Sequence, residues 1–204
     1  MNPGDQGSHG PAESTSLTLI ERVKARDADA WTRLSAIYGP TVYGWARRHG
    51  LREEDARDVT QEVFLAVAQH VGSFRRDRPG DSFRGWLWTI THNKVRDHFR
   101  RQAAEPQAAG GTAMHQLFEQ LPEVIDDSSS GSGPDDMTRV ARRALNVVRI
   151  EIEDRTFQAF VQVVMERRPP AEVAAELGMG IWAVYQAKSR VLRRLRRELE
   201  GLIG

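Results

Sequence analysis

Basic side chains gather near the C-terminal end of the chain, in numbers that suit the phosphate groups of nucleic acid. Segment 188–197 has six Lys or Arg residues and no acid. Just upstream, Ala174, Gly178 and Val184 have the spacing of a helix-turn-helix. In that motif a small residue lets two helices approach, and a glycine takes the left-handed turn. A β-branched residue then packs the second helix back onto the first.

Such a module places its second helix in the major groove, while downstream cations reach the phosphates. We therefore predict that residues 171–195 bind DNA; the alternative is an ordinary helical hairpin with a solvated basic face. The predicted DNA-binding side chains are Trp182, Ala183, Tyr185, Gln186, Lys188, Ser189, Arg190, Arg193, Arg194 and Arg197.

An acidic helix is predicted from residue 53, because segment 53–62 has five acids and one arginine. Its apolar stripe leaves Asp58, Gln61, Glu62 and Phe64 outside. A phenylalanine exposed among acids is typical of a protein contact rather than of DNA binding. A solvated acidic face with a partly buried Phe64 is an equally good interpretation of the composition.

A basic helix with interleaved aromatic residues is predicted over residues 83–101, after the basic loop 75–81. It has five bases and one acid. Aromatic rings that stack on bases, beside cations that follow phosphates, suit single-stranded nucleic acid. We expect Trp86 in the core, and Trp88 either in the core or as a stacking platform.

Other chemistries find little support in the composition. Cysteine is absent, which excludes thiol catalysis, disulfides and cysteine zinc sites. The six histidines form no HExxH motif, and the acids lie at predicted helix starts and in a linker rather than converging. We expect no enzyme activity, no cofactor and no metal. Polar residues 1–16 and the absence of a long apolar run predict no secretory leader, no membrane insertion and a cytoplasmic protein.

The elements that position these side chains are all predicted to be helices, because no segment alternates like a strand. Residues 29–48 form one helix, or two broken near Gly39 and Pro40. Segment 102–138 has seven acids and no base, and predicts an acidic flexible linker. The expected organisation is a disordered tail (1–16), a helical domain (17–101), this linker, and a helix-turn-helix domain (139–204).

Three stretches together resemble the extracytoplasmic-function sigma factors of bacterial RNA polymerase. They are DARDVTQEVFLAVAQHVGSFR (55–75), SFRGWLWTITHNKVRDHFRR (82–101) and AEVAAELGMGIWAVYQAKSRVLRRLRREL (171–199). The resemblance implies that the helix with Asp58, Gln61, Glu62 and Phe64 binds core polymerase. It also implies that the helix-turn-helix reads the minus-thirty-five element. The side chains expected at the minus-ten element are Arg76, Arg78, Trp88, Asn93, Lys94, Arg96, Asp97, Arg100 and Arg101.

The expected partners are therefore core RNA polymerase and promoter DNA, as duplex upstream and as a melted strand at the minus-ten element. The resemblance also admits an anti-sigma protein. At Trp182, Tyr185 and Gln186 the chain departs from the residues common in the family. The alternative hypothesis is a stand-alone helix-turn-helix repressor or activator whose acidic helix dimerises; a basic helix suited to melted DNA favours the sigma factor.

Overall fold

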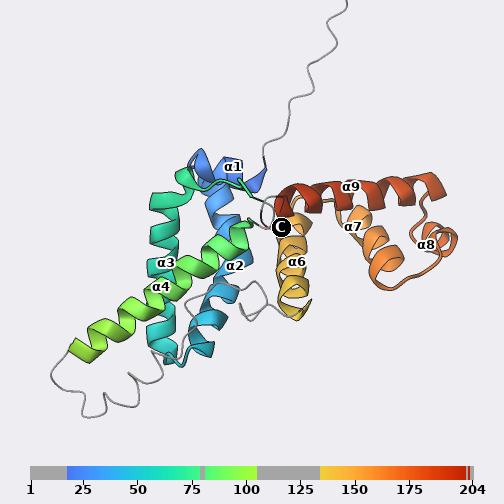
Figure 1. The fold of residues 1–204 in the computed structure, drawn as a ribbon. Coiled ribbons are helices and arrows are strands. Elements are labelled where there is room, and N and C mark those ends of the chain that lie inside the picture. The colour runs from blue at the N-terminus through green and yellow to red at the C-terminus, as the bar shows by residue number, and fades with distance from the viewer. Residues whose placement is uncertain (1–17, 79–80, 105–133, 201, 203–204) are drawn as a thin grey trace, which may run out of the picture.

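The computed structural model describes residues 18–78, 81–104, 134–200 and 202. The regular elements in these ranges are helices, which confirms the all-α prediction (Figure 1). Four α-helices and a short 3₁₀ turn form the first part: α1 (Leu19–Lys24), α2 (Ala28–Arg48), α3 (Glu53–His70), η1 (Val71–Ser73) and α4 (Phe83–Ala104). The second part comprises α6 (Pro134–Arg149), α7 (Asp154–Phe160), the π-helical η2 (Val161–Met165), α8 (Pro170–Glu176) and α9 (Ile181–Leu199).

Local sequence explains where these helices begin. Thr18 and Glu21 form a reciprocal capping box at α1, and the Asp27 side chain caps α2. Three acids occupy the first turn of α3, where the helix dipole favours negative charge. The Ser82 hydroxyl accepts the backbone N–H of Gly85 at 3.1 Å and so caps α4.

Helix α2 is continuous, so of the two predicted forms the unbroken one is correct. Pro40 lies inside it. A proline there removes one backbone hydrogen bond and crowds the preceding turn. Burial of Leu34, Tyr38 and Trp45 on the same helix favours the continuous form, since all three are fully buried.

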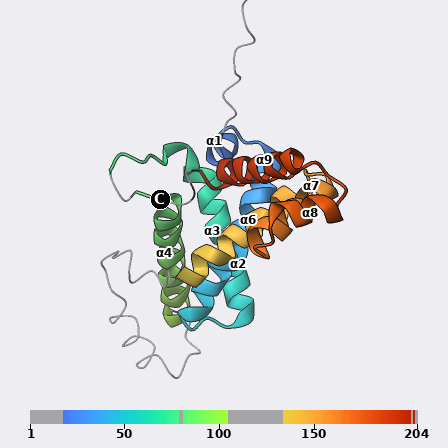
Figure 2. The same cartoon turned by 90° about the vertical axis from the view of Figure 1, so that its right-hand side faces the viewer.

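A single apolar core joins the first four helices to α6. It contains Tyr38 and Trp45 of α2, Phe83 of α4, and also Val140 and Ala144 of α6. Figures 1 and 2 show α6 between the first four helices and the group α7–α9. The helix-turn-helix has a smaller core of its own, in which Ala174 and Val184 are buried as predicted.

The segment after α7 is not a regular α-helix. Residues 161–165 form a π-helix, whose wider turn shifts the apolar face. Met165, at its end, is 53% exposed. Arg167 then takes a positive φ of 57°, and Pro170 begins α8. Ile181, the first residue of α9, is 43% exposed.

Polar contacts as well as apolar ones join the two parts. Arg143 of α6 donates to the Ile37 carbonyl at 2.7 Å and also to the Thr41 hydroxyl. Arg33 of α2 pairs with Glu198 of α9 at 3.1 Å. The predicted division into two domains remains a prediction, as does the linker, most of which (105–133) lies outside the described residues. Helix α6 begins at residue 134, five residues before the predicted domain start at 139.

Candidate nucleic-acid interface

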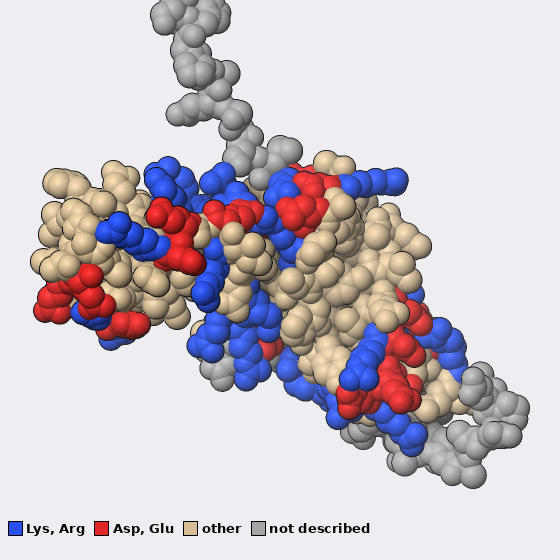
Figure 3. Space-filling model, turned by 180° about the vertical axis from the view of Figure 1, so that it is seen from behind, with Lys and Arg blue, Asp and Glu red and all other residues tan. Residues whose placement is uncertain are grey.

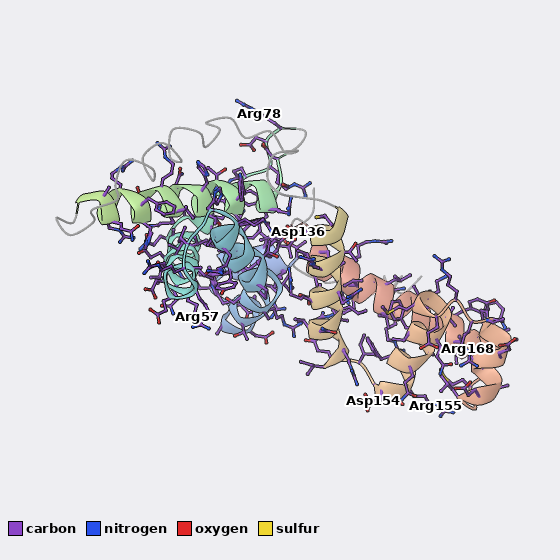
Figure 4. All side chains as sticks on the ribbon, turned by 90° about the horizontal axis from the view of Figure 1, so that it is seen from below. Arg57, Arg78, Asp136, Asp154, Arg155 and Arg168 are labelled. Carbon is purple, nitrogen blue, oxygen red and sulfur yellow. The ribbon has the colours of Figure 1, made fainter. Side chains whose placement is uncertain are left out.

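The turn of the helix-turn-helix is held from a neighbouring helix. Gly178 has a φ of 59°, the left-handed conformation that the sequence predicts. Arg155 of α7 donates from Nε to the Leu177 carbonyl at 2.9 Å and from Nη2 to the Gly178 carbonyl at 2.5 Å. These carbonyls follow α8 and have no helical partner of their own, so one guanidinium group fixes the angle at which α9 leaves the turn. Figure 4 labels Arg155 beside this turn. The sequence reading did not single out Arg155.

The outward face of α9 presents nearly all of the side chains predicted to read DNA. Trp182, Ala183, Tyr185, Gln186, Lys188, Ser189, Arg190 and Arg193 are exposed. Trp182 is 78% exposed and Tyr185 45%, and their rings meet edge to face at 6.2 Å. Exposed apolar side chains that adjoin one another are typical of an interaction site. The side chains near the start of this face of α9 are therefore aromatic, and those further along the helix are basic.

Arg194 and Arg197, near the end of α9, differ from the exposed basic residues of this helix because they are partly buried. Arg194 is half-buried and pairs with Glu198 at 3.2 Å and with Glu151 of the α6–α7 turn. Arg197 is also half-buried. In this arrangement the charge of Arg194 is neutralised within the protein, whereas Arg193 on the neighbouring position is exposed.

The acidic surface of α3 is built differently from the predicted one. Asp58 and Gln61 are exposed, but Phe64 is half-buried and packs against the main core. This position favours the second of the two interpretations of Phe64. The exposed apolar side chain of this surface is Leu65, which is 63% exposed. The sequence analysis named Phe64 instead, because an aromatic side chain among acids is typical of a protein contact.

Helix α4 lies against α3 and pairs with it electrostatically. The Glu62 carboxylate accepts from Arg101 at 2.8 Å and lies 3.7 Å from the Lys94 ammonium group. Asp97 pairs with Arg100 at 3.2 Å on the surface. Asn93 is exposed, and Arg96 is half-buried. The predicted minus-ten side chains of α4 thus lie on one helix, but two of them are also partners of the predicted polymerase-binding residue Glu62.

Trp88 is half-buried and packs against the main core, while its role as a stacking platform stays a prediction. Its ring packs edge to face on the buried Trp45 at 5.2 Å and stacks on His49 at 5.3 Å, while part of it stays exposed. Burial, and to a lesser extent the nearby His92 and Arg48, lower the pKa of His49 to about 4. Burial also lowers the pKa of His92, with Arg96 as a second cause. Both imidazoles are therefore neutral at pH 7.

The loop before α4 is folded around one carboxylate. Asp81 accepts the backbone N–H groups of Asp77 and Arg78 at 3.1 and 2.8 Å. Arg76 and Arg78 are exposed, and Arg78 extends from this loop in Figure 4. Acidic and basic side chains lie intermingled on the face that Figure 3 shows. That face is therefore not uniformly basic.

No helix in the described part of the chain is long and apolar enough to cross a membrane. Among the same residues, no group of three or more His, Asp or Glu side chains is arranged to hold a metal ion.

Comparison with known proteins identifies the family. The family model for sigma-70 region 2 matches residues 34–105, which include most of α2 and all of α3 and α4. The chain is 30% identical over 186 residues to the ECF RNA polymerase sigma factor BldN of Streptomyces coelicolor, covering 90% of this chain and 65% of BldN. It is 28% identical over 193 residues to the RNA polymerase sigma factor CnrH of Cupriavidus metallidurans, covering 93% of this chain and 96% of CnrH.

Two solved structures are also similar. The RsbN–BldN complex aligns with a TM-score of 0.35 and 21% identity, over 87% of this chain and 97% of that one. CnrH in complex with the cytosolic domain of CnrY aligns with a TM-score of 0.35 and 23% identity, over 87% and 92%.

The matched region and the helical fold define a protein of the sigma-70 class. Within that class, the chain belongs to the ECF RNA polymerase sigma factors. Members of this family are specificity subunits that direct RNA polymerase to promoters, and they are not enzymes.

Proposed function

We propose that this chain binds core RNA polymerase through α3, melted minus-ten DNA through α4 and its preceding loop, and the minus-thirty-five duplex through α9. The observation that carries the proposal is the exposed face of α9, from Trp182 to Arg193, behind a turn fixed by Gly178 and Arg155. Sequence-specific binding requires side chains that reach base edges from a rigid helix, and this face provides them.

The polymerase-binding part of the proposal rests on α3. Asp58, Gln61 and Leu65 are exposed on this helix, with Glu62 at its edge toward α4. An apolar side chain surrounded by polar ones is the usual arrangement of a protein-binding hot spot. Leu65 replaces Phe64 as the apolar contact in this proposal, because Phe64 packs against the core. A cytoplasmic location and an anti-sigma partner remain predictions of the same kind.

Promoter opening tests the proposal in the complete system. With core polymerase and a promoter fragment, the wild-type chain should make thymines near the start site reactive to permanganate. Asn93→Ala and Arg96→Ala should keep the closed complex and lose this reactivity, because they remove contacts to unpaired bases and their backbone. Normal reactivity in both variants would show that α4 does not hold the melted strand.

If the chain were a stand-alone repressor, the results expected for the wild-type chain would be the opposite. A repressor would form a stable dimer and would not bind core polymerase. Sedimentation of the wild-type chain with and without core polymerase separates the two classes before any variant is made.

A further inference from the structure

One carboxylate in this structure is surrounded by three guanidinium groups. Asp136, in the first turn of α6, is 8% exposed. Its Oδ2 lies 3.3 Å from Nη2 of Arg48 and 3.8 Å from Nη2 of Arg84, and its Oδ1 lies 3.8 Å from Nη1 of Arg139. Arg48 ends α2 and Arg84 lies in the first turn of α4, so the cluster joins three helices. Figure 4 shows Asp136 on α6 where it meets the first four helices.

Arg84 is the unusual member of this cluster. It is 7% exposed, and its guanidinium lies over the buried Trp45 ring at 5.5 Å. Its Nε and Nη2 are buried with no hydrogen-bond partner among the residues that the structure describes. Buried donors without partners are costly, and a planar guanidinium suits an anion that accepts two hydrogen bonds side by side. The Asp136 carboxylate, at 3.8 Å, does not provide them.

The surroundings of these arginines indicate which anion they suit. Arg48 adjoins His49, which stacks on Trp88, and Trp45 contacts both Trp88 and Arg84. A cation pair beside a partly exposed aromatic ring is the usual arrangement for single-stranded nucleic acid. A phosphodiester has two free oxygens that can bind Arg48 and Arg84 together, whereas Asp136 directs one oxygen at both.

We propose that Arg48 and Arg84 bind a backbone phosphate of promoter DNA, and that Asp136 occupies this site in the free protein. The inference rests on the proposed minus-ten role of α4. It adds to that role two phosphate-binding side chains, Arg48 and Arg84, and a carboxylate, Asp136, that competes with DNA for them. Because Arg139 belongs to α6, it would move away together with Asp136 when DNA binds, and it is not part of the phosphate site. Binding of DNA at the site requires α6 to move away from α2 and α4.

The phosphate site is tested with the full chain in complex with core polymerase. The ligand is a promoter fork whose minus-ten segment is single-stranded, and affinity is measured over a range of salt concentrations. Arg48→Gln and Arg84→Gln should each weaken binding about tenfold and lower the salt slope, and the two substitutions together should lower it by about 0.7, the value for one lost phosphate contact to a single strand. Arg139→Gln, which removes the same charge from α6, should leave both quantities unchanged. Wild-type slopes in both Arg48→Gln and Arg84→Gln would overturn the proposal.

The internal competitor is tested in the free full chain with the same DNA. Asp136→Asn should tighten binding several-fold, and should have no such effect when Arg48→Gln is also present. Asp154→Asn, an equal charge change at an exposed position of α7, is the matched control. Equal affinities for Asp136→Asn and Asp154→Asn would overturn the competitor role. Circular dichroism measures whether each variant is helical. If Arg84→Gln unfolds, the affinity and salt slope of Arg48→Gln, a change at an exposed position, test the phosphate site.

The same experiment distinguishes failure of the proposed function from failure of the phosphate site. If wild-type chain and polymerase do not bind the fork, the minus-ten role itself fails. If wild-type binds and the arginine variants keep its salt slope, only the phosphate site fails.

Discussion

The Arg101 guanidinium donates a hydrogen bond of 2.8 Å to the Glu62 carboxylate, so the acidic helix α3 and the basic helix α4 share a charge pair. Glu62 belongs to the proposed polymerase surface, and Arg101 to the proposed minus-ten surface. Reversing the charge of Glu62 would disturb both surfaces at once. Asp58 is a better position for such a test, because it is exposed and outside this pair.

Leu65 and Phe64 should respond differently to truncation. Leu65→Ala should reduce capture of core polymerase by more than tenfold and leave thermal stability nearly unchanged, since the side chain is 63% exposed. Phe64→Ala should mainly destabilise the fold, by less than the about 3–5 kcal/mol of a fully buried phenylalanine. Pull-down and thermal unfolding of both variants separate the effects. Equal polymerase capture by Leu65→Ala and wild type would remove Leu65 from the docking surface.

The basic residues of α9 should not contribute equally to DNA affinity. Arg193→Ala should lower the salt slope for the upstream duplex by about 0.9, because an exposed arginine releases about one counterion at a phosphate. Arg194→Ala should change the slope less, since Arg194 is paired with Glu151 and Glu198. Salt-titrated binding to one duplex compares the two. A larger slope change for Arg194→Ala would mean that these ion pairs break on DNA.

Gln186→Ala should alter base preference rather than overall affinity. Loss of a side-chain contact to a base costs about 1–3 kcal/mol at that position. Binding to a library of upstream elements shows the change as a relaxed preference at one position. A uniform loss across the library would place Gln186 on a phosphate instead.

Trp182 should read the methyl group of thymine, because it is the most exposed aromatic side chain at the start of α9 and apolar contact is how thymine is recognised there. Replacing thymines of the upstream element by uracil, one at a time, should weaken wild-type binding at one position. Trp182→Ala should bind weakly and show no difference between thymine and uracil at that position. Equal wild-type affinity for every uracil-substituted duplex would rule out methyl recognition.

Gly178→Ala should destabilise the helix-turn-helix. The left-handed φ of 59° costs a residue with a Cβ roughly 1–2 kcal/mol. The added Cβ would also lie 3.1 Å from Nη2 of Arg155. Gly180→Ala is the matched control, since φ is −68° there and nothing lies within 4 Å of its Cβ position. Thermal unfolding and upstream-duplex binding should both separate the two variants.

Acid should destabilise the protein through His49. Its pKa falls from 6.5 to about 4 on burial, so the unfolded chain binds the proton more readily than the folded one. The stability of the neutral form is therefore present above pH 6.5 and is lost as the pH falls towards about 4. Urea midpoints at several pH values measure this loss, to which His92 also contributes. His49→Gln should flatten the dependence; an unchanged slope would exclude His49 as a cause.

Local sequence was sufficient for the helices and for the helix-turn-helix. Ala174, Gly178 and Val184 lie within one short segment, and their sizes and backbone preferences determine the turn there. The same holds for the acidic start of α3 and for the basic stretch of α4. These features depend on neighbours a few residues away, which periodicity captures directly.

Tertiary structure decided which members of those patterns are available to a partner. Periodicity could not choose between Phe64 and Leu65, because the choice depends on how α3 packs against the core. It could not anticipate that a π-helical turn would expose Met165. Nor could it pair Arg194 with Glu151, or Asp136 with Arg84, since each pair joins segments far apart in the chain. The sequence by itself determined the helices and the chemistry of their faces. Packing determined which charged and aromatic side chains are buried or paired within the protein, because burial and ion pairing depend on distances that only the folded chain sets.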